Sequence, residues 1–429
     1  MPHYNCSGCH QPFEMQYTGD GFYGCPNCHS LLRVRNGDVS STIAMQGAHR
    51  KQWIQIGTEG TLHGEKYRII GYIERLESGT VYYWSEYVMQ RLRDNTTVFL
   101  AEYGGHWNLM EPIPDKPFTN VKVAQSTKTL LYQDKEFQAF SRYSAKYTYI
   151  VGEIPWELLY KKATKCVEFI RPPYMLAIEM AEQENHTHEF DTFHGTYIYP
   201  AEIRKGFLNG KYPPRREGVG PTQPFSRFLR PRQFVYGTLL FCLIAILFSL
   251  YSNGSRKNIE VFNQKLVIDS SAISNKQIVS PSYSLDADYS NLEIEFYSDV
   301  NNNWAALDLA LVNENTGKEY AFGMESSLYR GVEDGESWSE GSAYQKAFIC
   351  GVTRGTYHFV MSTSGEPRNG YISANVSAKY DVPTYWNEVL LCIILGVAAI
   401  GLLWWESKFN EERWFASNIN FKLYEDPSE

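Results

Sequence analysis

Two uninterrupted apolar runs divide a chain that elsewhere mixes apolar and polar positions. Phe234–Tyr251 and Val389–Trp405 carry no charged residue over 18 and 17 positions. Runs of this length lie near the lower limit for a helix that crosses a hydrocarbon core of about 30 Å. Buried core helices are the alternative, but core helices of this length rarely lack charge on every face. The pattern therefore predicts two transmembrane helices in a lipid bilayer, at residues 234–251 and 386–405.

Short strand-like runs, broken by glycine and charged turns, fill the segment before the first apolar run. Aromatic residues make up 15% of the chain, and they favour a pleated, half-buried surface over a helix. We therefore expect a β-rich domain over residues 50–207. Its clearest strands are Tyr67–Ile73, Val81–Met89, Thr97–Glu102 and Lys146–Val151.

The segment between the two apolar runs, residues 252–385, shows the same strand-like pattern. Six or more short strands at this spacing predict an antiparallel β-sandwich or a jelly roll, and periodicity does not separate the two. The expected strands are Leu292–Tyr297, Ala306–Val312, Glu319–Met324, Gln345–Ile349, Thr356–Met361 and Tyr371–Lys379.

Three connecting segments differ in composition from these domains. Residues 36–50 are predicted to be a polar linker. Residues 208–233 are a Pro/Arg-rich connector, too rich in proline for regular structure and expected to be extended. Residues 406–429 form a charged and aromatic tail, which we expect to include a helix against the membrane face.

Basic residues are concentrated before the first apolar run, where Arg215, Arg216, Arg227, Arg230 and Arg232 lie, whereas only Arg256 and Lys257 follow it. Cytoplasmic flanks of membrane helices carry the excess of Lys and Arg, so the N-terminal side is predicted to be cytoplasmic. With two spans the C-terminal tail returns to the same side. Residues 252–385 are then extracytoplasmic, and their 10 Lys+Arg and 17 Asp+Glu give a net charge of −7.

Four cysteines near the N-terminus have the spacing of metal ligands. Cys6-x2-Cys9 and Cys25-x2-Cys28 are separated by 15 residues. Each CxxC pair places two thiolates on one turn, and two such turns form the tetrahedral S4 cage that Zn2+ prefers. A cytoplasmic location keeps thiols reduced, which disfavours disulfides. We predict a zinc ribbon over residues 1–35, with structural Zn2+ bound by Cys6, Cys9, Cys25 and Cys28.

A histidine follows each CxxC pair, so both read C-x-x-C-H, which is also the attachment signature of c-type haem. Covalent haem attachment takes place outside the cytoplasm, whereas the charge asymmetry puts this end inside. His10 and His29 are therefore expected at the surface, although either is able to replace a cysteine ligand. The predicted fold class is mainly β with two transmembrane α-helices, a zinc ribbon, a β-rich cytoplasmic domain and an extracytoplasmic β-sandwich or jelly roll.

Two further polar clusters lack the spacing of a known site. His186, His188, Glu189, Asp191 and His194 are interpreted as a solvated loop, with metal binding as the open alternative. Glu333, Asp334, Glu336 and Glu340 do not follow the order of an EF-hand loop, so an acidic surface turn is expected rather than a Ca2+ site. The sequence contains no Walker loop, GxSxG elbow or HExxH motif.

A series of short motifs follows the ribbon: IGTEGTLHGEKYRIIGYI (56–73), WSEY (84–87), VGEIPW (151–156), RPPYMLAIE (171–179), HGTYI (194–198), GVGPTQP (218–224) and ERWFAS (412–417). Together they resemble a bacterial family, domain of unknown function four-one-seven-eight. Similar proteins tend to have GEY where this chain has Gly195-Thr196-Tyr197. The resemblance implies no reaction. It implies companionship with phage-shock-type membrane-remodelling proteins, and thus a role in envelope stress or membrane maintenance.

Two classes of function fit these patterns. The first is a non-enzymatic scaffold or sensor of the bacterial inner membrane, with both termini cytoplasmic, that binds cytoplasmic or membrane proteins and no nucleic acid. A homo-oligomer is also possible, because Ala245-x3-Ser249 gives the first span a small-residue face. The alternative is a ligand-binding module or enzyme in the cytoplasmic domain, with a site around Glu86, Glu102, His106 and Glu153.

Overall fold

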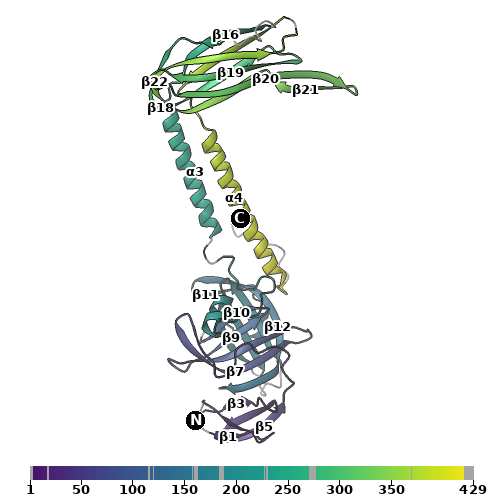
Figure 1. The fold of residues 1–429 in the computed structure, drawn as a ribbon. Coiled ribbons are helices and arrows are strands. Elements are labelled where there is room, and N and C mark those ends of the chain that lie inside the picture. The colour runs from purple at the N-terminus through teal and green to yellow at the C-terminus, as the bar shows by residue number, and fades with distance from the viewer. Residues whose placement is uncertain are drawn as a thin grey trace. The chain divides into compact units, whose positions relative to one another are not determined.

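The computed structural model divides the chain into two compact units rich in strands (Figure 1). The first unit comprises residues 1–231 and 401–429, and the second comprises residues 232–400. The structure describes residues 3–16, 19–114, 116–118, 120–156, 158, 163–182, 188–226, 228, 230–269, 277–368 and 370–419.

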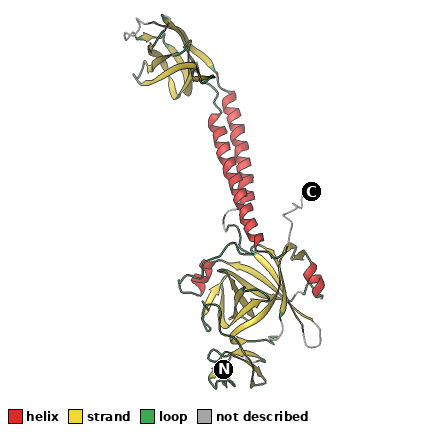
Figure 2. Cartoon of the chain, turned by 90° about the vertical axis from the view of Figure 1, so that its right-hand side faces the viewer, coloured by secondary structure: helices red, strands yellow, loops and turns green. Residues whose placement is uncertain are grey.

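Eight antiparallel strands of the first unit pair into a closed ring. β12 (Lys135–Ile154) pairs with β13 through residues 138–145 and with β7 through residues 146–152, and these two pairings close the ring. Figure 2 shows these strands wrapped into a barrel. In order round the ring the other strands are β7 (Glu65–Glu77), β8 (Tyr83–Arg91), β9 (Thr97–Tyr103), β10 (His106–Ile113), β15 (His188–Ile198), β14 (Tyr174–Glu182) and β13 (Thr164–Arg171).

The outer face of the barrel is apolar and is covered by short elements. β6 (Glu59–Leu62) and α2 (Pro200–Gly206) cover one part, where Trp107 and Tyr87 are fully buried. α1 (Val121–Ser126) and β11 (Thr129–Tyr132) cover another part, around Phe169. The side chain of Asn120 caps α1 by accepting hydrogen bonds from the first backbone N–H groups. Apolar residues on this face alternate along each strand with residues that point into the barrel.

The N-terminal strands continue the sheet of the barrel. β3 (Gly21–Gly24) pairs with residues 152–154 of β12, and β4 (Ser30–Arg35) and β5 (Asp38–Ala44) follow in order. β1 (His3–Asn5) and β2 (Pro12–Glu14) form a separate hairpin. The polar linker predicted for residues 36–50 is therefore partly replaced by β5, which pairs with β4 through backbone hydrogen bonds that polar residues make as readily as apolar ones.

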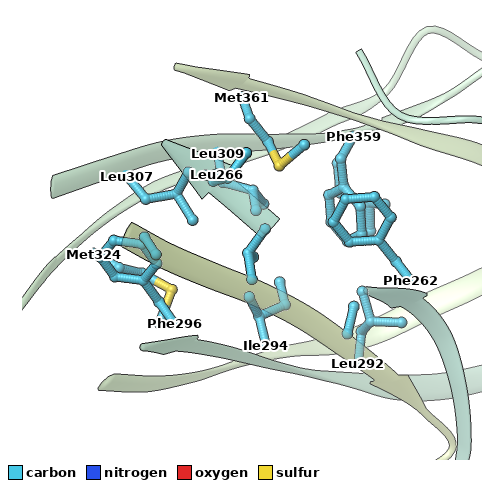
Figure 3. Close-up of a cluster of buried hydrophobic side chains, with 14 of the residues drawn as sticks. Phe262, Leu266, Leu292, Ile294, Phe296, Leu307, Leu309, Met324, Phe359 and Met361 are labelled. Atoms are coloured by element: carbon cyan, nitrogen blue, oxygen red, sulfur yellow. The ribbon is translucent and has the colours of Figure 1, made fainter. Parts of the chain in front are cut away.

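The second unit contains one continuous antiparallel sheet around an apolar core. Figure 3 shows Leu292, Ile294 and Phe296 of one strand facing Leu309 and Met361 of others. The strand order is β16 (Ile259–Asp269), β23 (Tyr371–Tyr380), β18 (Tyr283–Ser298), β22 (Tyr344–Gly365), β19 (Asn303–Asn313), β20 (Glu319–Glu333) and β21 (Glu336–Ser342), with β17 (Ile278–Val279) pairing with β22.

β22 corrects one detail of the strand prediction. Gln345–Ile349 and Thr356–Met361 were expected to be two strands, but both belong to this one strand of 22 residues. Gly351 has a positive φ of 72°, and the register with β18 shifts near this position. The irregularity interrupts the alternation of apolar residues without ending the strand.

Among the described residues, two helices are long and apolar enough to cross a membrane. They are α3 (Pro231–Gly254) and α4 (Trp386–Phe415), and only 6% of the apolar window of each is buried. The side chain of Asn253 bonds both the N–H and the C=O of Thr384, which joins the end of α3 to the start of α4. Residues 406–415 are helical, as expected for the tail, and they continue α4 without a break; residues 420–429 lie outside the described part.

The pairing of β3 of the ribbon with β12 gives a first prediction. A Cβ on Gly24 would lie 2.2 Å from the carbonyl oxygen of Ile150, which no real contact permits. We expect Gly24→Ala to lower the free energy of unfolding of the first unit by about 1–3 kcal/mol, because the paired strands must separate. Urea unfolding of the purified chain measures this change.

Gly47→Ala is the matched control, since nothing lies within 4 Å of a Cβ at that position. Equal stability of the two variants would show that β3 and β12 are not closely paired.

Candidate functional site

The four predicted cysteine ligands converge at one point. Their Sγ atoms all lie within 4.8 Å of one another, with Cys6 and Cys28 at 3.6 Å and Cys9 and Cys25 at 3.7 Å. A tetrahedron of sulfurs about 2.3 Å from zinc has edges of about 3.8 Å, so the thiols already have the spacing that the ion requires. The cluster is consistent with a zinc ribbon, as the sequence predicts.

The two halves of the cluster have the same backbone geometry. His10 donates its N–H to the carbonyl of Cys6 at 2.8 Å, and His29 does so to Cys25 at 3.0 Å. Both histidines have a positive φ, of 61° and 56°. The left-handed backbone conformation of each histidine lets the chain turn back after the second cysteine of each pair, so both thiols face one centre.

The surroundings of the thiols give them unequal acidities. Burial raises the pKa of Cys25 to about 12 and also raises that of Cys6. The hydrogen bond with the Ser30 hydroxyl lowers the pKa of Cys28 to about 6, and a bond with Asn27 lowers that of Cys9. A bound cation favours the thiolate form of every member, because its charge offsets both burial and mutual repulsion.

The two histidines do not take the place of a thiol ligand. His10 is exposed, as expected, whereas His29 is half-buried with its ring 5.5 Å from that of Tyr149. His29 is therefore only partly at the surface, because β3 and β12 bring the ribbon against the barrel.

A second cluster lies inside the barrel and includes Glu86. Along β13 the inward residues change from Ile170 through Glu168 to Cys166, and along β14 from Met175 to Glu179. The ion pair of Arg75 with Glu179 joins β7 to β14, which are not neighbours in the ring. Contacts of this kind cross the barrel, so these side chains occupy its interior.

The other three residues of the predicted alternative site lie elsewhere. Glu102 is buried on the outer face, where Arg50 donates to it at 2.5 Å beside a shallow pocket of about 300 Å³. His106 is buried with its ring nitrogens against the Tyr197 hydroxyl and the carbonyl of Glu217, and burial lowers its pKa. Glu153 accepts from the backbone of Gln16 and thus helps to hold the ribbon. The four therefore do not form one site.

The remaining polar clusters are dispersed. His194 packs between the rings of Tyr132 and Tyr174. Asp191 lies on the opposite face of the sheet, where it is the neighbour of Glu179 in the β14–β15 register. His186 and the side chain of His188 lie outside the described residues. Glu333, Asp334, Glu336 and Glu340 belong to the β20–β21 hairpin, whose turn has positive φ at Asp334 and Gly335. Within the described residues, Cys6, Cys9, Cys25 and Cys28 are the one group of three or more His, Cys, Asp or Glu ligands gathered around a point.

Comparison with known proteins supports the resemblance over the barrel. Residues 55–200 match a family described as Domain of unknown function (DUF4178), and this stretch contains strands β6 to β15. No curated protein matches the chain.

Two solved structures of infectious bursal disease virus are similar at a low level. The structure of the Gx strain has 9% identity and a TM-score of 0.17, over 89% of this chain and 70% of the viral chain. The structure of the Gt strain has 8% identity and a TM-score of 0.14, over 89% and 75%. TM-scores this low carry no argument about fold or function.

The cysteine cluster predicts one bound zinc ion per chain. We expect Cys28→Ser to lose the metal, because a neutral hydroxyl replaces the thiolate with the lowest pKa. Chelation of the wild-type protein should unfold the ribbon and leave the barrel paired, since metal affinity stabilises so small a module. Elemental analysis and limited proteolysis measure the two effects.

Cys350→Ser serves as the control, because Cys350 is exposed in the second unit. Full zinc content in Cys28→Ser, or none in the wild-type chain, would contradict the assignment.

The barrel interior predicts a pH effect. Burial, together with the charges of Glu179 and Glu77, raises the pKa of Glu168 to about 7 despite its bond from Tyr143. The folded state then binds more protons than the unfolded state between about pH 4.5 and 7, so stability falls as pH rises through that window. Glu168→Gln should therefore raise Tm at pH 8 relative to wild type and change it little at pH 5. A constant Tm difference across pH would contradict this.

Proposed function

We propose that this protein is a non-enzymatic scaffold or sensor of the bacterial inner membrane. In this proposal α3 and α4 span the bilayer, the first unit and both termini are cytoplasmic, and the second unit is extracytoplasmic. The exposed apolar faces of the two helices support the membrane assignment, because side chains of this kind need lipid around them.

Charge supports the proposed orientation. The two cations that follow α3 are engaged locally, since Arg256 pairs with Asp381 at 2.7 Å and Lys257 pairs with Asp286. The bond from Arg256 is one reason why the pKa of Asp381 lies below its usual range, although burial acts in the opposite direction. Among the described residues, Arg230 and Arg232 before α3 have no ion pair of this kind, so they add positive charge on the proposed cytoplasmic side. Arg227 lies outside the described residues.

The cysteine cluster supports a structural rather than a catalytic role for zinc. Four thiolates fill a tetrahedral site and leave no position for water or substrate. Gly21 and Gly24 let β3 lie close to β12, so the ribbon extends the sheet of the barrel. In our proposal this extended sheet presents the cytoplasmic docking surface for partner proteins.

The observation that carries the proposal is the anchorage of α4. The ring of Trp414, in its last turn, lies 5.5 Å from Phe140 of β12. Just beyond the helix, Asn418 bonds both the C=O and the N–H of Arg142 at 2.8 and 3.0 Å. One unbroken helix thus contains the second apolar run and ends against the barrel. We infer that α4, more than the proline-rich connector, carries changes from the membrane to the barrel.

Partner identity follows only from the family resemblance, which implies phage-shock-type membrane-remodelling proteins. The small-residue face of α3 is not open to a second copy at Ser249, because this residue is buried and bonded to Asn253. We assign this face to packing within the chain.

A double-mutant experiment tests the proposal. Asp381→Asn removes the anchor of Arg256 in the second unit and should change amide hydrogen exchange in β12 around residues 140–142. Adding Trp414→Ala should reduce that change in exchange by at least half, because the contact with Phe140 is lost. Exchange is measured by mass spectrometry on the full chain in lipid nanodiscs.

Phe415→Ala is the matched control, since Phe415 neighbours Trp414 and is 92% exposed. Labelling of Cys350 in spheroplasts by an impermeant maleimide first confirms the orientation. Unchanged exchange in Asp381→Asn, or protection of Cys350 from the reagent, would overturn the sensor proposal.

A further inference from the structure

The interior of the barrel contains more negative than positive charge. Among the described residues, Glu86, Glu168 and Glu179 lie there with one guanidinium, that of Arg75, which is 2% exposed. Arg75 pairs with Glu86 at 3.3 Å and with Glu179, while Glu168 accepts a hydrogen bond from Tyr143 at 2.8 Å. Three carboxylates against one cation leave an attraction for a further positive group.

This cluster has capacity for further hydrogen bonds. Within the described residues, Nε of Arg75 is buried without an acceptor. Each of Glu168 and Glu179 has one oxygen bonded to a described partner, so the other oxygen is able to accept. A buried donor without a partner costs free energy, and a ligand oxygen that accepts from it removes that cost.

The side chains around Arg75 favour a small organic molecule. Eight-stranded barrels enclose room for side chains or for one small ligand. The guanidinium carbon of Arg75 lies 5.4 Å from the ring centre of Trp84 and 5.1 Å from that of Tyr147, so aromatic faces line the charged end. The side chains of Glu86 and Glu179 are 15% and 24% exposed, so solvent reaches the cluster. A single metal ion does not fit, because among the described residues only the cysteines gather three ligands around one point.

We propose that the charged end of the barrel binds a small ammonium compound that also carries an oxygen acceptor, as amino alcohols and amino acids do. The ammonium group bonds the carboxylates of Glu168 and Glu179, and the ligand oxygen accepts from Nε of Arg75. This site is independent of the proposed membrane role, because every group belongs to the barrel.

Calorimetric titration of the full chain with ethanolamine tests the site. Ethylamine lacks the oxygen and ethylene glycol lacks the ammonium group, so we expect the first to bind about tenfold more weakly and the second not to bind. Glycine, with a carboxylate as its oxygen, distinguishes the two kinds of acceptor. Binding of ethylene glycol equal to that of ethanolamine, or no binding of ethanolamine or glycine, would overturn the proposal.

Two variants identify the location. Glu179→Gln should weaken ethanolamine binding about tenfold or more, because a charge-assisted bond is lost. Glu168→Gln keeps an acceptor for Tyr143 and provides a second test if the first variant unfolds. Glu136→Gln is the matched control, since Glu136 is an exposed residue of β12 beside β11. Undiminished binding in both interior variants would place the ligand elsewhere.

Discussion

The double pairing of β12 is the constraint on which the first unit depends. One strand of 20 residues pairs with β13 along its first part and with β7 along its second. Shifts of register at residues 139–141 and 147–149 bend it enough to serve both partners. Without this closure the sheet would keep open edges, and Arg75 and Glu179 would not meet.

Closure also explains the unequal faces of the barrel strands. The outer face is apolar because α1, α2 and short strands cover it, whereas part of the inner face is charged. A buried ion pair recovers little more than its desolvation cost, and apolar side chains of equal volume would pack the same space at least as stably. Arg75 and its carboxylates are therefore better explained by recognition than by stability.

The helix α4 also combines two roles. Its apolar stretch is suited to lipid, yet its last turn carries Trp414 and Arg413, which pack and bond within the first unit. A continuous helix resists bending because each turn is fixed by backbone hydrogen bonds. If the C-terminal end of α4 were free, the helix would serve only as a membrane anchor. Because this end is fixed to the barrel, a movement of the helix is also able to move the barrel.

The sequence by itself determined what depends on local chemistry and spacing. Two charge-free runs are sufficient to specify the apolar helices, and two CxxC pairs to specify the cysteine cluster, because nearby residues make these features. Alternation also located strands such as β7 and β9. Only the tertiary structure decided the ring closure and the union of ribbon and barrel, which rest on pairings between distant strands. It likewise brought Glu86 to Arg75 and separated it from Glu102, since neighbours across a barrel leave no periodic trace in the chain.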